Sequence, residues 1–217
     1  NTSKNYTMMT MGSDGETSSA LNLDLTGGPS SGNDVARLNI LALHDGKYLI
    51  TFRDGPDDTS NPLGINYSNH ANTGQYAQLY NNSGQKIKDT FGINDHLPGH
   101  ADGGQYQPLK DGGFISVWRS AHLPNDSNRT SVSARLFDSL GNPVGGQFQV
   151  NDVIVNYQAK ARVSVLEDGS FVIVWHDTSF PSLDGSSRTI VAEHYESDGT
   201  VRKNDFIANT TTEYLQD

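Results

Sequence analysis

The sequence has no cysteine and no long run of apolar residues. The first absence excludes disulfide bonds. A cytosolic protein can lack cysteine by chance, whereas a secreted protein without disulfides needs another means of stabilisation, and bound calcium is the usual one. The second absence leaves no segment that could span a membrane as a helix, and we expect no membrane insertion. The chain also begins at Asn1 rather than Met, and we read it as part of a larger multidomain chain.

Basic residues are scarce: 15 Lys and Arg stand against 25 Asp and Glu, which gives a formal net charge of −10. This charge argues against nucleic acid and anionic membranes as partners, because both are negatively charged. Acidic loops can instead hold cations, or they can simply keep the protein soluble. Only 34% of the 217 residues are hydrophobic and 22 are glycine, a balance typical of short strands joined by polar turns.

One three-part pattern occurs three times along the chain. Its first part is Leu-x-Asp-Gly followed by an apolar run that ends in an aromatic residue, its second is Ala-x-x-aromatic-x-x-x-Gly, and its third runs from Phe to Asn. The spacings from Asp to the terminal aromatic, from Ala to Gly and from Gly to Phe are seven in every copy. The three copies are Leu43–Phe52, Ala77–Gly84 and Phe91–Asn94; Leu109–Trp118, Ala134–Gly141 and Phe148–Asn151; and Leu166–Trp175, Ala192–Gly199 and Phe206–Asn209.

Each copy predicts about four short antiparallel strands, the size of a propeller blade. Asp-Gly favours a tight turn, and the run after it carries bulk on both faces, so it should be an inner strand. The sequence therefore predicts an all-β fold of three propeller-blade-like antiparallel repeats in one compact domain, with a β-sandwich as the alternative. The expected single domain, 1–217, divides into an N-terminal strand or extension at 1–34 and repeats at 35–95, 96–152 and 153–210.

Departures from the repeat indicate where function should lie. The first copy has 25 residues from Phe52 to Ala77, where the others have 16 and 17. This longer loop crowds oxygen-bearing side chains of the kind that calcium prefers, although such residues also favour ordinary solvated turns. A later loop contains His96 and His100, which could bind zinc or could belong to an ordinary connecting loop. The residues predicted to bind Ca²⁺ are Asp54, Asp57, Asp58, Asn61, Asp95, Asp102 and Asp126.

Polar residues follow the aromatic residue that ends each apolar run, and these could meet a carboxylate or a sugar. Core packing is the alternative role for the aromatic residues themselves. The predicted ligand-binding set is Arg53, Trp118, Arg119, His176 and Asp177.

No catalytic residue is predicted. A glycoside hydrolase needs paired carboxylates, glutamate is scarce, and the chain shows no convincing Ser-His-Asp set. We therefore expect that the chain is not an enzyme. The alternative that stays open is a hydrolase or lyase acting on glycans from a propeller-like scaffold.

The repeat resembles one found in tandem in bacterial calcium-dependent RTX exoproteins and giant adhesins. Residues 109–152, with LKDGGFISVW and then ARLFDSLGNPVGGQFQVND, match it best, and the resemblance covers about residues 35–210. A set of three repeats is similar to the peptide-binding domain of large RTX adhesins of Gram-negative bacteria. The resemblance implies an extracellular adhesion module at the bacterial surface, in which bound Ca²⁺ captures the C-terminal carboxylate of peptides from cell-surface proteins. A calcium-dependent, lectin-like domain that binds glycans is the alternative.

Overall fold

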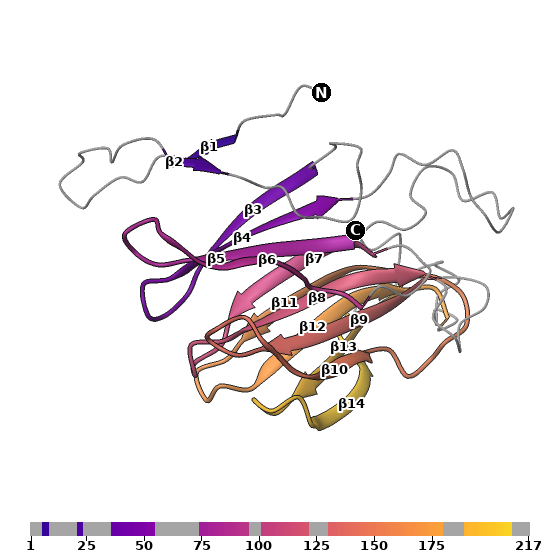
Figure 1. Cartoon of the computed structure of the whole chain (residues 1–217). Helices are drawn as coiled ribbons and strands as arrows, with labels where there is room; N and C mark the ends of the chain where they lie inside the picture. Colours follow the sequence, from indigo (N-terminus) through magenta and orange to yellow (C-terminus); the bar gives the residue numbers. More distant parts are fainter. Residues whose placement is uncertain are drawn as a thin grey trace, which may run out of the picture.

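The computed structural model describes residues 6–8, 21–23, 36–54, 74–95, 101–121, 130–179 and 189–209, and for a few of these, Asp54 and Asp102 included, only the backbone. No helix in these ranges is long and apolar enough to cross a membrane. All regular elements in the described ranges are strands (Figure 1). They are β1 (Tyr6–Met8), β2 (Leu21–Leu23), β3 (Ala36–Ala42), β4 (Tyr48–Asp54), β5 (Gly74–Tyr80), β6 (Lys86–Gly92), β7 (Ala101–Pro108), β8 (Phe114–Ala121), β9 (Thr130–Phe137), β10 (Pro143–Gln149), β11 (Gln158–Val165), β12 (Phe171–Asp177), β13 (Thr189–Tyr195) and β14 (Val201–Ile207).

Each copy of the sequence pattern forms one four-stranded antiparallel sheet. The strand orders are β3-β4-β5-β6 in the first sheet, β7-β8-β9-β10 in the second and β11-β12-β13-β14 in the third, so every sheet is a simple meander. The prediction of an all-β fold built from three antiparallel repeats is confirmed. The residue numbers at which one repeat ends and the next begins stay a prediction.

The Asp-Gly pairs form the tips of the first hairpin in each sheet, as the sequence predicts. Gly46, Gly112 and Gly169 have φ angles of +78°, +88° and +89°, a left-handed conformation that glycine adopts at no steric cost. In the second sheet, the backbone N–H of Gly112 donates to the carbonyl of Leu109 at 3.0 Å and closes the turn. The bonds in the other two sheets are equivalent, so the repeated dipeptide sets the same turn three times.

The hydrophobic core lies between neighbouring sheets. One cluster joins the first and second sheets through residues such as Leu79, Phe114 and Trp118. A second cluster joins the second and third sheets through residues such as Val132 and Trp175. Strand β8 has buried side chains on both of its faces, as its sequence predicts, because it is an inner strand of the middle sheet.

The expected N-terminal strand or extension contains two short strands. β1 and β2 pair with each other and form a separate two-stranded ribbon. The four strands of each sheet all come from within one repeat, so no sheet needs a strand from the N-terminal segment.

The asparagine that ends each repeat has a structural role. The side-chain oxygens of Asn94, Asn151 and Asn209 accept hydrogen bonds from the backbone N–H groups two residues before the Ala that recurs in each copy, at 2.7, 2.8 and 2.9 Å. These side chains connect the end of the fourth strand to the third strand in each sheet. Asn151 is buried, and its amide also donates to the carbonyl of Val153 at 2.9 Å.

We predict that Asn151→Ala lowers the free energy of unfolding by about 1–3 kcal/mol, because it leaves buried backbone groups without partners. Urea denaturation measures this change. The exposed turn residue Asn82 provides a control, and Asn82→Ala should change stability by less than about 0.5 kcal/mol. Equal effects of the two substitutions would contradict the role assigned to the repeated asparagine.

Candidate functional site

The three sheets are copies of one pattern, so equivalent positions that carry different side chains indicate candidate functional sites. Two such places stand out. One lies between the second and third sheets and is acidic. The other lies between the first and second sheets and is a polar cavity.

The acidic place consists of Asp152, Glu193 and Asp205, each of which has a carboxylate oxygen within 4.8 Å of the others. Glu193 lies on the inner strand β13 and is 2% exposed. Its neighbour Asp205 lies on β14, and Asp152 follows β10 of the preceding sheet. The backbone N–H of Asp152 donates to Asp205 Oδ2 at 3.2 Å, which ties the two sheets together.

The equivalent place between the first and second sheets is an ion pair. Counted from the repeat motif, its members are Asp95, Arg135 and Gln147. The guanidinium of Arg135 lies 2.8 Å from Asp95 Oδ1. The backbone N–H of Asp95 donates to Gln147 Oε1 at 3.0 Å, as that of Asp152 does to Asp205. The backbone connection is therefore kept, while Arg is replaced by Glu193 and Gln by Asp205.

This exchange removes a positive charge and adds two negative ones, one of them on the buried side chain of Glu193. Burial is the largest cause that raises the pKa of Glu193, to about 7, and the charges of Asp205 and Asp152 act in the same direction. The hydroxyl of Tyr195 donates to Glu193 and partly offsets this. Burial likewise raises the pKa of Asp205 to about 6.

Three converging carboxylates can hold a metal ion where the second sheet has a guanidinium. Hard cations such as Ca²⁺ prefer carboxylate oxygens, and an ion here would replace the missing positive charge. The arrangement thus supports a metal-binding group in the described part of the chain. The sequence did not point to it, although comparing Arg135 with Glu193 across the repeats would have done so.

We predict that, in buffer containing a chelator, the protein loses stability as the pH rises from about 4.5 to about 7. Glu193 has a pKa of about 7 when folded, raised from the ordinary value of 4.5, so the folded protein keeps a proton that the unfolded chain releases in this window. Thermal melting at several pH values measures the loss, and Glu193→Gln should reduce it. A melting temperature that rises over this range in the wild type would contradict the assignment.

We also predict that the triple substitution Glu193→Arg, Tyr195→Phe and Asp205→Gln makes the melting temperature independent of Ca²⁺. These substitutions introduce the residues that the second sheet has at the equivalent positions. There, Arg135 lies over the Phe137 ring at 5.7 Å and pairs with an aspartate. The control Asp89→Asn removes a carboxylate that is 91% exposed and should leave the response to Ca²⁺ unchanged. A triple variant that responds to Ca²⁺ as the wild type does would show that any ion binds elsewhere.

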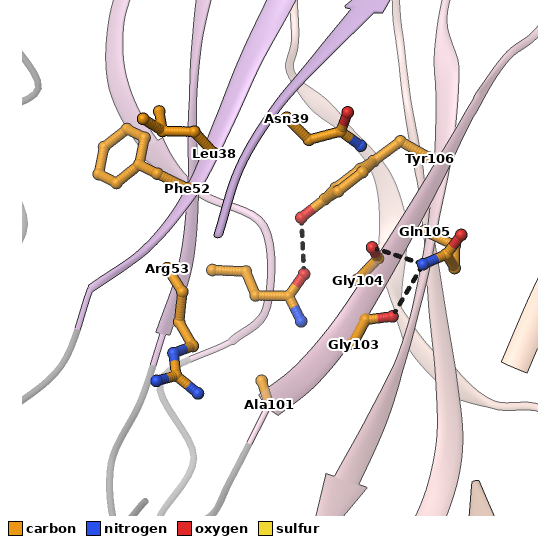
Figure 2. Close-up of a pocket in the computed structure, with 10 residues that line it drawn as sticks. Leu38, Asn39, Phe52, Arg53, Ala101, Gly103, Gly104, Gln105 and Tyr106 are labelled. Atoms are coloured by element: carbon orange, nitrogen blue, oxygen red, sulfur yellow. Dashed lines mark hydrogen bonds between the residues drawn. The ribbon is translucent and has the colours of Figure 1, made fainter. Parts of the chain in front are cut away.

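The second place is a cavity of about 220 Å³ between the first sheet and strand β7 (Figure 2). Arg53 and Gln75 are direct partners on β4 and β5, and both line the cavity. The hydroxyl of Tyr106 donates to Gln75 Oε1 at 2.7 Å. Gln75 is 3% exposed, and among the described residues its Nε2 atom has no hydrogen-bond partner. The cavity is lined by Leu38, Asn39, Phe52, Arg53, Gln75, Ala101, Gly103, Gly104, Gln105 and Tyr106.

The equivalent place between the second and third sheets is filled with hydrophobic side chains. Gln75 is replaced there by Val132, and Tyr106 by Val163. Both valines belong to the hydrophobic cluster that joins those two sheets. We call the contact between the first and second sheets the first junction and that between the second and third sheets the second junction. The first junction has polar groups and a cavity where the second has hydrophobic core packing.

Glycine at position 104 makes room for the Gln75–Tyr106 pair. A Cβ atom at Gly104 would lie 2.6 Å from the Tyr106 hydroxyl and closer still to Gln75 Oε1. The third sheet has Ala161 at this position, next to valines that leave room for it. The glycine at position 104 is thus needed where the Gln75–Tyr106 pair is present, between the first and second sheets.

The predicted ligand-binding residues lie in different surroundings. Arg53 lines the cavity, whereas Arg119 donates to the Tyr157 hydroxyl at 2.7 Å outside it. Trp118 is 1% exposed in the core between the first two sheets. His176 is half-buried on β12. Asp177 is fully buried, where its carboxylate accepts from Trp175 Nε1 at 3.1 Å and from the N–H of Ser179 at 2.6 Å.

Asp95 is the one predicted metal ligand whose side chain the structure describes, so the predicted set stays a prediction. Asp95 pairs with Arg135, and Asp54 and Asp102 lie on β4 and β7 with only their backbones described. The remaining four lie outside the described residues: Asp57, Asp58, Asn61 and Asp126.

Comparison with known proteins adds a fold-level likeness. No protein-family model and no curated protein matches the chain. Among the solved structures that resemble it is the crystal structure of an endo-arabinase from Bacteroides thetaiotaomicron VPI-5482, with 14% sequence identity and a TM-score of 0.46. The match covers 82% of this chain and 63% of the arabinase chain, so this chain spans less than two thirds of that protein.

This comparison corrects the expectation that the chain is not an enzyme, because the similar structure is itself an enzyme. At this identity and TM-score, the similarity does not assign arabinase activity to the chain.

Proposed function

We propose that this chain is a carbohydrate-binding module whose scaffold is stabilised by bound Ca²⁺. The observation that carries the proposal is the cavity beside Gln75, where a buried amide and open space replace the valines that fill the next junction. A scaffold position that changes from core packing to a buried, unpartnered polar group is costly, and a ligand that pairs with the group offsets that cost.

The lining of the cavity suits a sugar. Sugar hydroxyls both donate and accept hydrogen bonds, and the amides of Gln75, Asn39 and Gln105 offer groups of both kinds. Leu38 also lines the cavity and adds apolar surface for the C–H groups of a sugar ring.

Calcium is the finer part of the proposal for the acidic group. Asp152, Glu193 and Asp205 offer three hard oxygen ligands from two neighbouring sheets. An ion there would hold the second and third sheets together, as the Arg135–Asp95 pair holds the first and second. Its role is structural, and it lies at a different junction from the cavity.

The setting of this module is proposed from the sequence pattern. The repeat resembles that of RTX adhesins, which supports an extracellular adhesion module at a bacterial surface, carried on a longer chain. A second candidate ligand is the C-terminal carboxylate of a surface peptide, and the positive charge of Arg53 beside the cavity favours it.

Thermal melting with added ligands tests the proposal. Ca²⁺ should raise the melting temperature and a chelator should reverse the rise, because an ion that binds only the folded state stabilises it. A panel of oligosaccharides, tested next, should contain members that raise it further. A panel of peptides with free or amidated C-termini serves as the comparison.

Stabilisation by free-carboxylate peptides alone would replace the carbohydrate assignment with the peptide one. Release of shorter sugars from the oligosaccharides would show that the site is catalytic. No response to any member of either panel would contradict a binding function.

A further inference from the structure

We propose that the cavity beside Gln75 is selective for acidic sugars, and that it binds the carboxylate of a uronic acid residue through Arg53 and Gln75. This inference rests on the proposed carbohydrate-binding function and specifies its ligand. It does not depend on the Ca²⁺ site, which lies at the other junction.

The first support is charge. The whole chain carries a net charge of −10, yet Arg53 is the one charged residue among the described residues that line the cavity. A cation in a concave, partly enclosed place attracts anions more strongly than it would on an open surface. Arg53 therefore brings a positively charged hydrogen-bond donor to the lining of the cavity.

The second support is the direction of the Gln75 amide. The Tyr106 hydroxyl donates to Oε1 of Gln75 at 2.7 Å, which leaves the Nε2 atom as the end of the amide that can donate. That atom is buried and has no partner among the described residues. Gln75 pairs with Arg53 across β4 and β5, so both side chains leave the same face of the sheet. A carboxylate has two oxygens and can accept from both groups at once.

The third support is size. A cavity of about 220 Å³ is smaller than the roughly 300–1,000 Å³ of pockets for drug-sized ligands. It suits one sugar ring. The neutral groups around it, Asn39, Gln105 and the Gly103 carbonyl among them, can pair with ring hydroxyls while the carboxylate faces Arg53.

Two matched sugars test this proposal on the full chain. Methyl glucuronide and methyl glucoside differ only in a carboxylate that replaces a hydroxymethyl group. In an NMR titration, the glucuronide should bind at least about tenfold more tightly than the glucoside and should shift the side-chain NH₂ resonances of Gln75. Equal affinity for the two sugars would overturn the proposal.

Two substitutions locate the binding. Arg53→Gln removes the positive charge and Gln75→Glu adds a repelling carboxylate, so each should weaken glucuronide binding by about tenfold or more. Arg162→Gln, at an exposed arginine of the third sheet, is the control and should bind as the wild type does. If Gln75→Glu unfolds the protein, Arg53→Gln decides the test alone, since Arg53 is only half-buried. Unchanged binding by Arg53→Gln would refute the site.

The outcomes separate this inference from the proposed function. Binding of neutral glycans without preference for the acid leaves a carbohydrate-binding module standing and overturns the selectivity. Binding of free-carboxylate peptides in place of both sugars overturns both. Loss of glucuronide binding in Arg53→Gln, with an unchanged melting temperature, supports both.

Discussion

Packing between neighbouring sheets is the constraint on which this structure depends. A four-stranded meander has two faces, and it is stable only when its inner strand is covered. The middle sheet is covered on both sides, and Phe114 and Trp118 serve one cluster while Val117 and Val132 serve the other. The three sheets thus form one body, and each junction between them is a place where side chains from two repeats must fit.

The two junctions differ in where they carry polar or charged groups. The first is neutral where Arg135 pairs with Asp95, but it keeps a polar cavity beside Gln75. The second fills the place of that cavity with valines, but it gathers the carboxylates of Asp152, Glu193 and Asp205. The cavity at the first junction is therefore the candidate site for a ligand. The uncompensated carboxylates at the second junction are the candidate site for an ion.

A repeat protein gives an internal comparison that a single domain lacks. The asparagine that ends each repeat and the glycine of each Asp-Gly turn are the same in all three sheets, because the backbone needs them everywhere. Functional side chains need not be repeated, because one site is enough. The position that holds Gln75, Val132 and Ile190 in the three copies, buried in the first two, is for that reason more informative than an acidic loop.

The sequence alone determined the strand count of each repeat, the hairpin tips and the inner strands, because these follow from local turn chemistry and from alternation along one segment. It also singled out Arg53, which lines the cavity of the first junction. Only the tertiary structure decided which repeats share a junction, and hence that Asp152 of one copy meets Glu193 of the next. Such contacts depend on how two sheets stack, and no spacing within one repeat encodes them.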